Sequence, residues 1–138
     1  MPVHHHINHL AVLVSAVAIF ILGGLWYSPV LFAKPWVRLM GKTDEELRAK
    51  AGGPASFLVA FLCGLLTAGA MAMIIAHFGV ITVGPAVLVA FICWLGFAGA
   101  TSYGSALFSG QPFALWLINS GYNLVAFIVA AIILTLWR

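Results

Sequence analysis

Charged side chains are nearly absent from this sequence outside one short segment. The 138 residues include six Lys or Arg and three Asp or Glu, and all of these except Arg138 lie between Lys34 and Lys50. The long apolar stretches therefore offer no carboxylate proton relay, charged selectivity ring or voltage sensor. No Gly-rich phosphate loop and no converging nucleophile, acid and base are found, so we expect no enzymatic activity and no cofactor.

Metal-binding and disulfide-forming residues are also few. Cys63 and Cys93 are the two cysteines, and both lie in apolar stretches at different expected depths, which argues against a disulfide. The first residues include His4, His5, His6 and His9, but no acid or cysteine accompanies them. We expect no metal site.

Apolar residues make up most of the chain. They account for 64% of it, and the mean hydropathy of +1.13 is typical of a membrane protein. Four spans are expected at about 8–28, 55–77, 84–106 and 113–137, each near the roughly 20 residues that a helix needs to cross a bilayer. Lipid cannot satisfy backbone polar groups, so the spans should be helices. We predict an all-α, single membrane domain over residues 1–138, folded as a four-helix bundle.

The charged segment lies in the first loop, residues 29–54, and predicts the topology. Its five Lys and Arg residues place this loop in the cytoplasm and both termini outside it, in a bacterial inner (cell) membrane. Thr43 and Glu46 have the spacing of a capping box, which predicts a short amphipathic cytoplasmic helix between the first two spans. Acids mixed among the bases argue against nucleic acid.

Basic and aromatic residues of this loop suggest contact with membrane lipids. Lys34, Arg38 and Lys42 lie close to Trp36, so they could bind lipid headgroups on an anionic inner leaflet. The alternative is an ordinary positive-inside loop without a specific lipid. Aromatic residues expected to anchor the cytoplasmic interface are Trp26, Tyr27, Trp36, Tyr103 and Trp116.

A faint internal repeat links the ends of the first and third spans. Tyr27, Leu31 and Phe32 recur at a constant offset as Tyr103, Leu107 and Phe108. Both segments leave the membrane on the same side in the expected topology, so the repeat predicts two parallel helix-pair units. Coincidence is the alternative, because Leu and Phe are common in membrane chains.

Small residues at four-residue spacing mark two faces for close helix packing. They are Ala60, Gly64 and Ala68 in the second span and Gly96, Ala100 and Gly104 in the third. The spacing leaves open whether each face meets another helix of the same chain or a second copy.

Polar residues inside the third and fourth spans form the candidate site. Unpaired polar groups are costly in hydrocarbon, so we expect these residues to form one cluster between the two helices, with Thr67 of the second span as a further member. Its members are Thr101, Ser102, Ser105, Asn119, Ser120 and Asn123. The cluster acts either as hydrogen bonds that hold helices together or as a cytoplasm-facing cavity for a small polar molecule or lipid headgroup.

Two sequence runs resemble a known family. Trp26-Tyr27-Ser28-Pro29 and Ile118-Asn119-Ser120-Gly121-Tyr122, with Trp94-Leu95-Gly96-Phe97 between them, are similar to runs in a widespread bacterial family of small four-span membrane proteins known only as a domain of unknown function. The resemblance covers almost the whole chain. It implies four membrane helices and supplies no activity.

These observations favour a protein that acts by packing and binding. We expect a non-enzymatic membrane subunit that forms a homo-oligomer or joins a larger membrane complex. The alternative is a small channel or carrier for a neutral or amphipathic solute, lined by Thr101, Ser105, Asn119 and Asn123.

Overall fold

The computed structural model of this protein describes residues 7–41, 45–46 and 54–137. This part of the chain folds into helices joined by turns, without a strand. Helices long and apolar enough to cross a membrane cover His9–Trp26, Pro54–His77, Val83–Phe108 and Phe113–Leu136. The four predicted spans are confirmed to within two residues at each end, and the chain is an all-α, multi-pass membrane protein.

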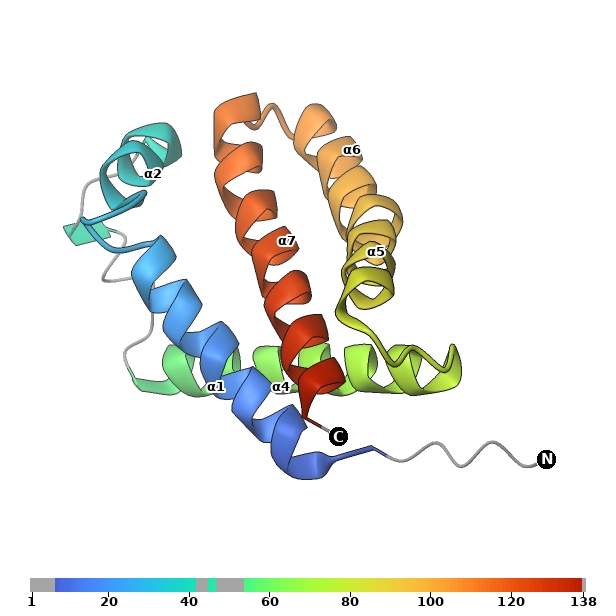
Figure 1. Ribbon diagram of the computed structural model, residues 1–138. Coiled ribbons are helices and arrows are strands. Elements are labelled where there is room, and N and C mark those ends of the chain that lie inside the picture. The colour runs from blue at the N-terminus through green and yellow to red at the C-terminus, as the bar shows by residue number, and fades with distance from the viewer. Residues whose placement is uncertain (1–6, 42–44, 47–53, 138) are drawn as a thin grey trace.

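The helices are labelled as in Figure 1. They are α1 His9–Trp26, α2 Ala33–Met40, α4 Pro54–His77, α5 Val83–Cys93, the π-helix η1 Trp94–Gly99, α6 Ala100–Phe108 and α7 Phe113–Leu136. The third span is thus one continuous helix made of α5, η1 and α6. A short helix, α2, lies in the first loop, between the first two spans.

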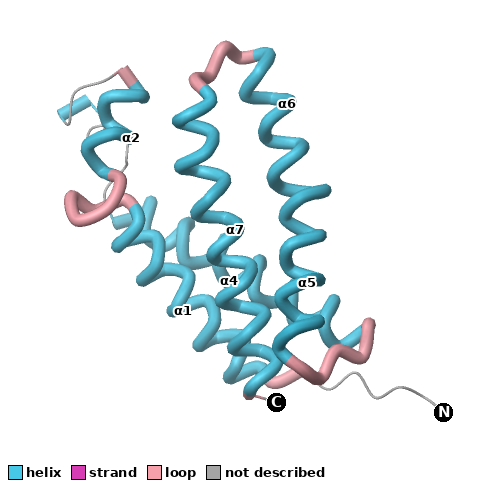
Figure 2. The backbone as a smooth tube through the Cα atoms, turned by 45° about the horizontal axis from the view of Figure 1, so that its top comes forward, coloured by secondary structure: helices cyan, strands magenta, loops and turns pink. Residues whose placement is uncertain are grey.

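Three of the long helices lie side by side, and the fourth crosses them. Figure 1 shows α7 between α1 and the α5–η1–α6 helix, with α4 running across behind the lower parts of all three. Figure 2 shows the same arrangement from a second direction, with α2 and the turn between α6 and α7 at the opposite end from the C-terminus. The first turns of α4 project beyond the other helices, which leaves Phe57, Leu58 and Val59 exposed.

Local sequence explains where several helices begin and end. The side chain of Asn8 accepts hydrogen bonds from the backbone N–H groups of Leu10 and Ala11, at 3.0 and 3.2 Å, and so caps α1. Helix α4 ends at His77. Two residues later, Gly79 has a φ of 66°, which glycine adopts readily, and the next N–H, of Val80, donates back to the Ile75 carbonyl.

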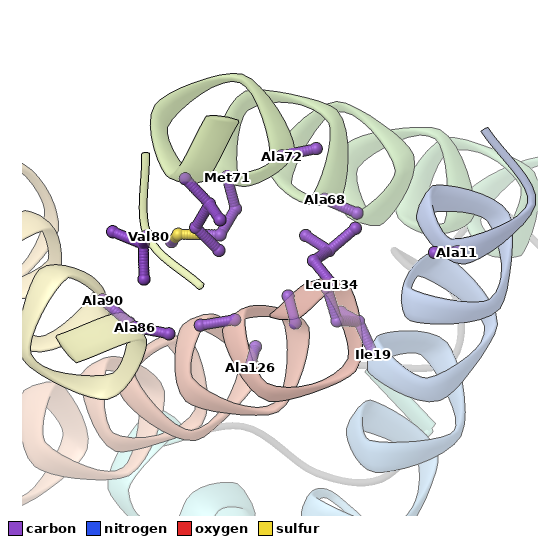
Figure 3. Close-up of a cluster of buried hydrophobic side chains, with 13 residues drawn as sticks. Ala11, Ile19, Ala68, Met71, Ala72, Val80, Ala86, Ala90, Ala126 and Leu134 are labelled. Atoms are coloured by element: carbon purple, nitrogen blue, oxygen red, sulfur yellow. The ribbon is translucent and has the colours of Figure 1, made fainter. Parts of the chain in front are cut away.

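Small side chains dominate the buried core. On α7, Ala126, Ala130 and Leu134 lie on one face and are at most 7% exposed. Figure 3 shows this face meeting residues from the three other long helices. Its partners include Ile19 of α1, Ala68, Met71 and Ala72 of α4, and Ala86 and Ala90 of α5. Alanines let the backbones approach closely, which is how helices gain packing energy in lipid.

The π-helix η1 is a local widening in the third span. Hydroxyl groups just beyond it bond to its carbonyls: Thr101 Oγ1 donates to Phe97 O at 2.8 Å and Ser102 Oγ to Gly99 O at 3.1 Å. These bonds supply additional partners for the carbonyls of the widened turn. The hydroxyls of Thr101 and Ser102 therefore donate within their own helix.

The predicted helix near Thr43–Glu46 lies mostly outside the described residues, as does Lys42, although Glu45 and Glu46 are helical. The described amphipathic helix, α2, lies earlier in the loop. It begins after Phe32, whose N–H bonds to Trp26 O, and ends at Gly41, where φ is 68°. A left-handed residue of this kind cannot continue the helix.

The two halves of the chain pack differently. Helix α1 lies against both α4 and α7, whereas the α5–η1–α6 helix lies mainly against α7. Two equivalent helix pairs would give both units the same neighbours. The parallel repeat stays a prediction from the short sequence run and has no counterpart in the helix packing.

Candidate functional site

One segment of α7, Ile118–Tyr122, binds both of the helices that flank it. The indole N–H of Trp26, the last residue of α1, donates to the backbone oxygen of Ile118 at 2.9 Å. From the other side, the indole N–H of Trp94 in η1 donates to the backbone oxygen of Ser120, also at 2.9 Å. A helix carbonyl has a second lone pair, so it can accept both its own helical bond and an indole. We call Ile118–Tyr122 the α7 hub.

Two tyrosines add further bonds between the hub and α1. Tyr27 Oη donates to Asn119 Oδ1 at 2.7 Å, and Tyr122 Oη donates to the backbone oxygen of Ile19 at 3.0 Å. Tyr27 follows the last residue of the first span, and burial, with Tyr122 close by, raises the pKa of its phenol to about 12. The phenol therefore stays protonated at neutral pH and acts as the donor.

Aromatic rings extend the hub to α2. The ring of Tyr27 lies edge-on to the rings of Trp36 and Tyr122, with centroids 5.5 and 5.8 Å apart. The ring of Trp26 lies 4.8 Å from that of Phe32, in the turn before α2. Such contacts contribute about 1 kcal/mol each beyond the area they bury. They position α2 against the ends of α1 and α7.

Glycines make room for two of these rings. A Cβ atom on Gly121 would lie 3.3 Å from Cζ2 of Trp26, and one on Gly23 would lie 3.0 Å from Oη of Tyr122. Both distances are shorter than ordinary van der Waals contact. The rings of Trp26 and Tyr122 thus lie directly against helix backbone, which brings α1 close to α7.

A separate contact joins α6 to the start of α7. The indole N–H of Trp116 donates to Ser102 Oγ at 2.9 Å, and the Trp116 ring lies 5.1 Å from that of Tyr103. Ser102 is thus a predicted cluster residue that does connect the third and fourth spans. It does so through Trp116, which we expected to be a lipid-interface anchor.

The other predicted cluster residues do not gather between α6 and α7. Thr101 and Ser105 are exposed and bond to carbonyls of their own helix, and Thr67 bonds to Cys63 O in the same way. Asn119 binds Tyr27 of α1 instead of a residue of α6. Equal depth in the membrane brought these residues together in the prediction, but depth does not determine which neighbour each side chain faces.

Ser120 in the hub and Asn123 next to it have unused hydrogen-bonding groups. Ser120 is 2% exposed, and its hydroxyl has no partner among the described residues. Asn123, one turn after Asn119, is half-buried, and its side chain makes no hydrogen bond to the described part of the chain. A primary amide in hydrocarbon is costly without a partner. Asn123 is therefore the residue through which a polar molecule or a second chain could bind.

The predicted interface anchors all take part in contacts within the chain. Trp26, Tyr27 and Trp116 donate hydrogen bonds, while Trp36 and Tyr103 make ring contacts. Sequence reasoning missed Trp94 as a partner of the hub and Tyr122 as a hub residue. The signal for Tyr122 was present, because it lies in the same run as Asn119. The signal for Trp94 is its place in the middle of a span, because an indole N–H there needs an acceptor.

Metal-ligating side chains are not grouped in the described ranges. No three His, Cys, Asp or Glu residues lie close enough there to hold an ion. Residues His4, His5 and His6 lie outside these ranges. The hub offers neutral donors and acceptors, which suit hydrogen bonding to helices or to uncharged polar groups.

The two sequence runs that suggested a family meet in the hub: Trp26 and Tyr27 come from one, and Ile118–Tyr122 is the other. A family model described as "Protein of unknown function (DUF1761)" matches residues 10–135. The chain belongs to this family. No curated protein and no solved structure matches the chain. The DUF1761 match spans all four long helices, including every hub contact described above.

Replacement of Asn119 by Leu should destabilise the protein, whereas the same change at Asn123 should not. Asn119→Leu leaves the Tyr27 hydroxyl without its acceptor and should lower the free energy of unfolding by about 1 kcal/mol. Asn123→Leu removes an amide that has no partner among the described residues, so it should change the free energy of unfolding by less than about 0.5 kcal/mol. Denaturant titration in detergent micelles measures both.

The double variant Tyr27→Phe/Asn119→Leu is the internal control. It should be no less stable than Asn119→Leu alone, because the hydroxyl that lost its acceptor is gone. Equal losses at Asn119 and Asn123 would contradict the assignment of the Tyr27 bond as the stabilising contact.

Proposed function

We propose that this DUF1761 protein is a non-enzymatic subunit of a bacterial inner-membrane assembly, formed with its own copies or with a partner membrane protein. The proposal includes the expected topology, in which both termini lie outside the cytoplasm. The observation that supports it is the uncovered small-residue face of the third span. Gly96 and Ala100 are exposed, and a Cβ atom on Gly96 or Gly104 would meet nothing within 4 Å.

The two predicted small-residue faces have different surroundings in the structure. In α4, Gly64 and Ala68 are buried, with Gly64 lying against Ile19 and the Ala16 backbone of α1. Ala60 is exposed. Within the described ranges, the face on the third span has no such neighbour at Gly96 or Gly104. The most apolar 18-residue stretch of the third span is 17% buried, against 28% for that of each other span. Small residues gain packing energy only when another helix backbone approaches, so this face favours a helix from another chain.

A large side chain at Ala100 should therefore weaken assembly without unfolding the subunit. We expect Ala100→Leu to shift the mass of the complex, extracted from its own membrane into lipid nanodiscs, toward the 14.7 kDa chain. Ala70→Leu is the matched control, because Ala70 is an exposed alanine on α4. The Ala70 variant should keep the wild-type mass. A single-chain mass for the wild-type protein, or an unchanged mass for Ala100→Leu, would contradict the proposal.

The second candidate function is a small channel or carrier for a neutral or amphipathic solute. It is favoured by the amide of Asn123 and the buried hydroxyl of Ser120, neither of which has a partner in the part of the chain that the structure describes. Thr101 and Ser105 would line the same path only where two chains meet, because both are exposed. Glycerol flux into proteoliposomes tests this candidate. A flux that Asn123→Leu abolishes supports it, and no flux above that of empty vesicles removes it.

A further inference from the structure

Helix α2 presents two positive charges and no other exposed side chain. Among its eight residues, only Lys34 and Arg38 are exposed, and they lie one turn apart on the same face. The opposite face is occupied by half-buried residues, including Trp36, which contacts Tyr27. Trp36 therefore fixes which side of α2 faces away from the protein.

The two charges have no counter-ion in the described part of the chain. Neither Lys34 nor Arg38 forms an ion pair with another residue in the described ranges. Like charges one helical turn apart repel each other and destabilise the helix that carries them. An anion bound between them would remove this repulsion, so the arrangement calls for a negatively charged ligand.

The surroundings of α2 indicate where that anion comes from. Helix α2 lies beside the ends of α1 and α7, at the same end of the molecule as the turn between α6 and α7 (Figures 1 and 2). The neighbouring residues Leu25, Val30 and Leu31 are 49, 78 and 42% exposed. Exposed apolar side chains beside exposed cations fit a molecule with an acyl chain and an anionic headgroup better than a free ion.

We propose that α2 binds an anionic phospholipid, with the lipid phosphate between Lys34 and Arg38 and the acyl chains against Leu25, Val30 and Leu31. The bound lipid holds α2 against Tyr27 and so stabilises the α1 side of the α7 hub. This inference goes beyond the proposed assembly role and does not depend on it, because every residue it uses lies on one chain.

The test is lipid retention by the full-length protein. The protein is placed in nanodiscs made of an equal mixture of phosphatidylcholine and phosphatidylglycerol, and native mass spectrometry counts the phosphatidylglycerol that stays bound. We expect the double variant Lys34→Gln/Arg38→Gln to bind this lipid about thirty-fold more weakly, and each single variant about five-fold more weakly, from the usual contribution of a basic residue at a membrane surface.

The matched control is Arg48→Gln/Lys50→Gln, which removes the same charge from the same loop. It should retain phosphatidylglycerol like the wild type. Equal losses in the two double variants would overturn the proposal, because binding would then follow the total charge of the loop. Displacement of the lipid by inorganic phosphate, with no effect of Leu31→Gln on lipid retention, would also overturn it by showing a site for a free anion. The single variants keep the test valid if the double variant fails to fold.

Discussion

Replacing Gly99 with Leu should cost about 3 kcal/mol of folding free energy, although the change is from a poor helix former to a good one. Gly99 is buried at the end of the π-helix η1, and a Cβ atom there would lie 3.2 Å from Cε2 and Cζ2 of Trp94. The Trp94 ring would have to move, and its bond to Ser120 O would be lost. The third span would then lose its hydrogen bond to the α7 hub.

Gly96→Leu is the control for this prediction. Gly96 lies in the same π-helix, but it is exposed and a Cβ atom there would meet nothing within 4 Å. Its replacement should change the folding stability of the single subunit by no more than about 1 kcal/mol, in the stabilising direction given by helix propensity. Its effect on the proposed assembly is a separate quantity, measured by the mass of the complex. Both variants are compared by denaturant titration in micelles.

The labelling rate of Cys93 measures the local effect of these changes, in addition to the overall stability measured by denaturant titration. It is half-buried and immediately precedes Trp94. In a Cys63→Ser background, maleimide should label Cys93 faster in the Gly99 variant than in the Gly96 variant, because a displaced indole loosens the packing around it. Similar labelling rates and similar stabilities for the two glycine variants would show that Trp94 does not depend on the space at Gly99.

The positions of the spans could be predicted because charge and length determine them. A helix in lipid must avoid ionised side chains and must be long enough to cross the hydrocarbon. The segment between Lys34 and Lys50 meets neither condition, so it separates the first span from the second. These constraints act on each segment by itself. They need no knowledge of the neighbouring helices, so four stretches read from the sequence match the four long helices of the structure.

The arrangement of those helices could not be predicted in the same way. In water, an apolar stripe tells which face of a helix is buried, but lipid is as apolar as the side chains and selects no face. Gly64 and Ala68 lie in the core, while Gly96 and Ala100, at the same four-residue spacing, lie on the surface. The crossing of α4 behind the other helices and the π turn at Trp94–Gly99 follow from packing between segments distant in sequence.

The α7 hub contains residues of the predicted polar cluster, but their contacts with other helices could not be predicted. Asn119 was expected to find its partner on the third span, but in the structure its side chain accepts a hydrogen bond from Tyr27, at the end of α1. Tyr27 and Trp26 had been assigned to the lipid interface, where their polar groups would meet water or headgroups. An indole N–H or a phenol at the end of a span can equally be satisfied by a neighbouring helix. Composition cannot distinguish these two outcomes, whereas the pairing of two family-like sequence runs could have suggested the second.

A second large loss of stability is expected from a substitution at Gly23, where α1 contacts α7. A Cβ atom on Gly23 would lie 3.0 Å from Oη and 3.3 Å from Cζ of Tyr122, whose hydroxyl donates to Ile19 O on the same helix. Gly23→Leu should therefore displace the Tyr122 ring and lower the free energy of unfolding by about 3 kcal/mol. Its neighbour provides the control, because Gly24 is exposed and a Cβ atom there meets nothing within 4 Å.

A double-mutant cycle separates this steric effect from a general intolerance of α1 to large residues. If Gly23→Leu acts by pushing out the Tyr122 ring, it should cost less than about 1 kcal/mol in a Tyr122→Ala background, where the ring is absent. Gly24→Leu should be nearly neutral in both backgrounds. An undiminished cost of Gly23→Leu without the ring would mean that α1 is held to α7 by contacts other than Tyr122. The bond from Trp26 to Ile118 O would then carry this interface, and Trp26→Phe should become the more damaging change.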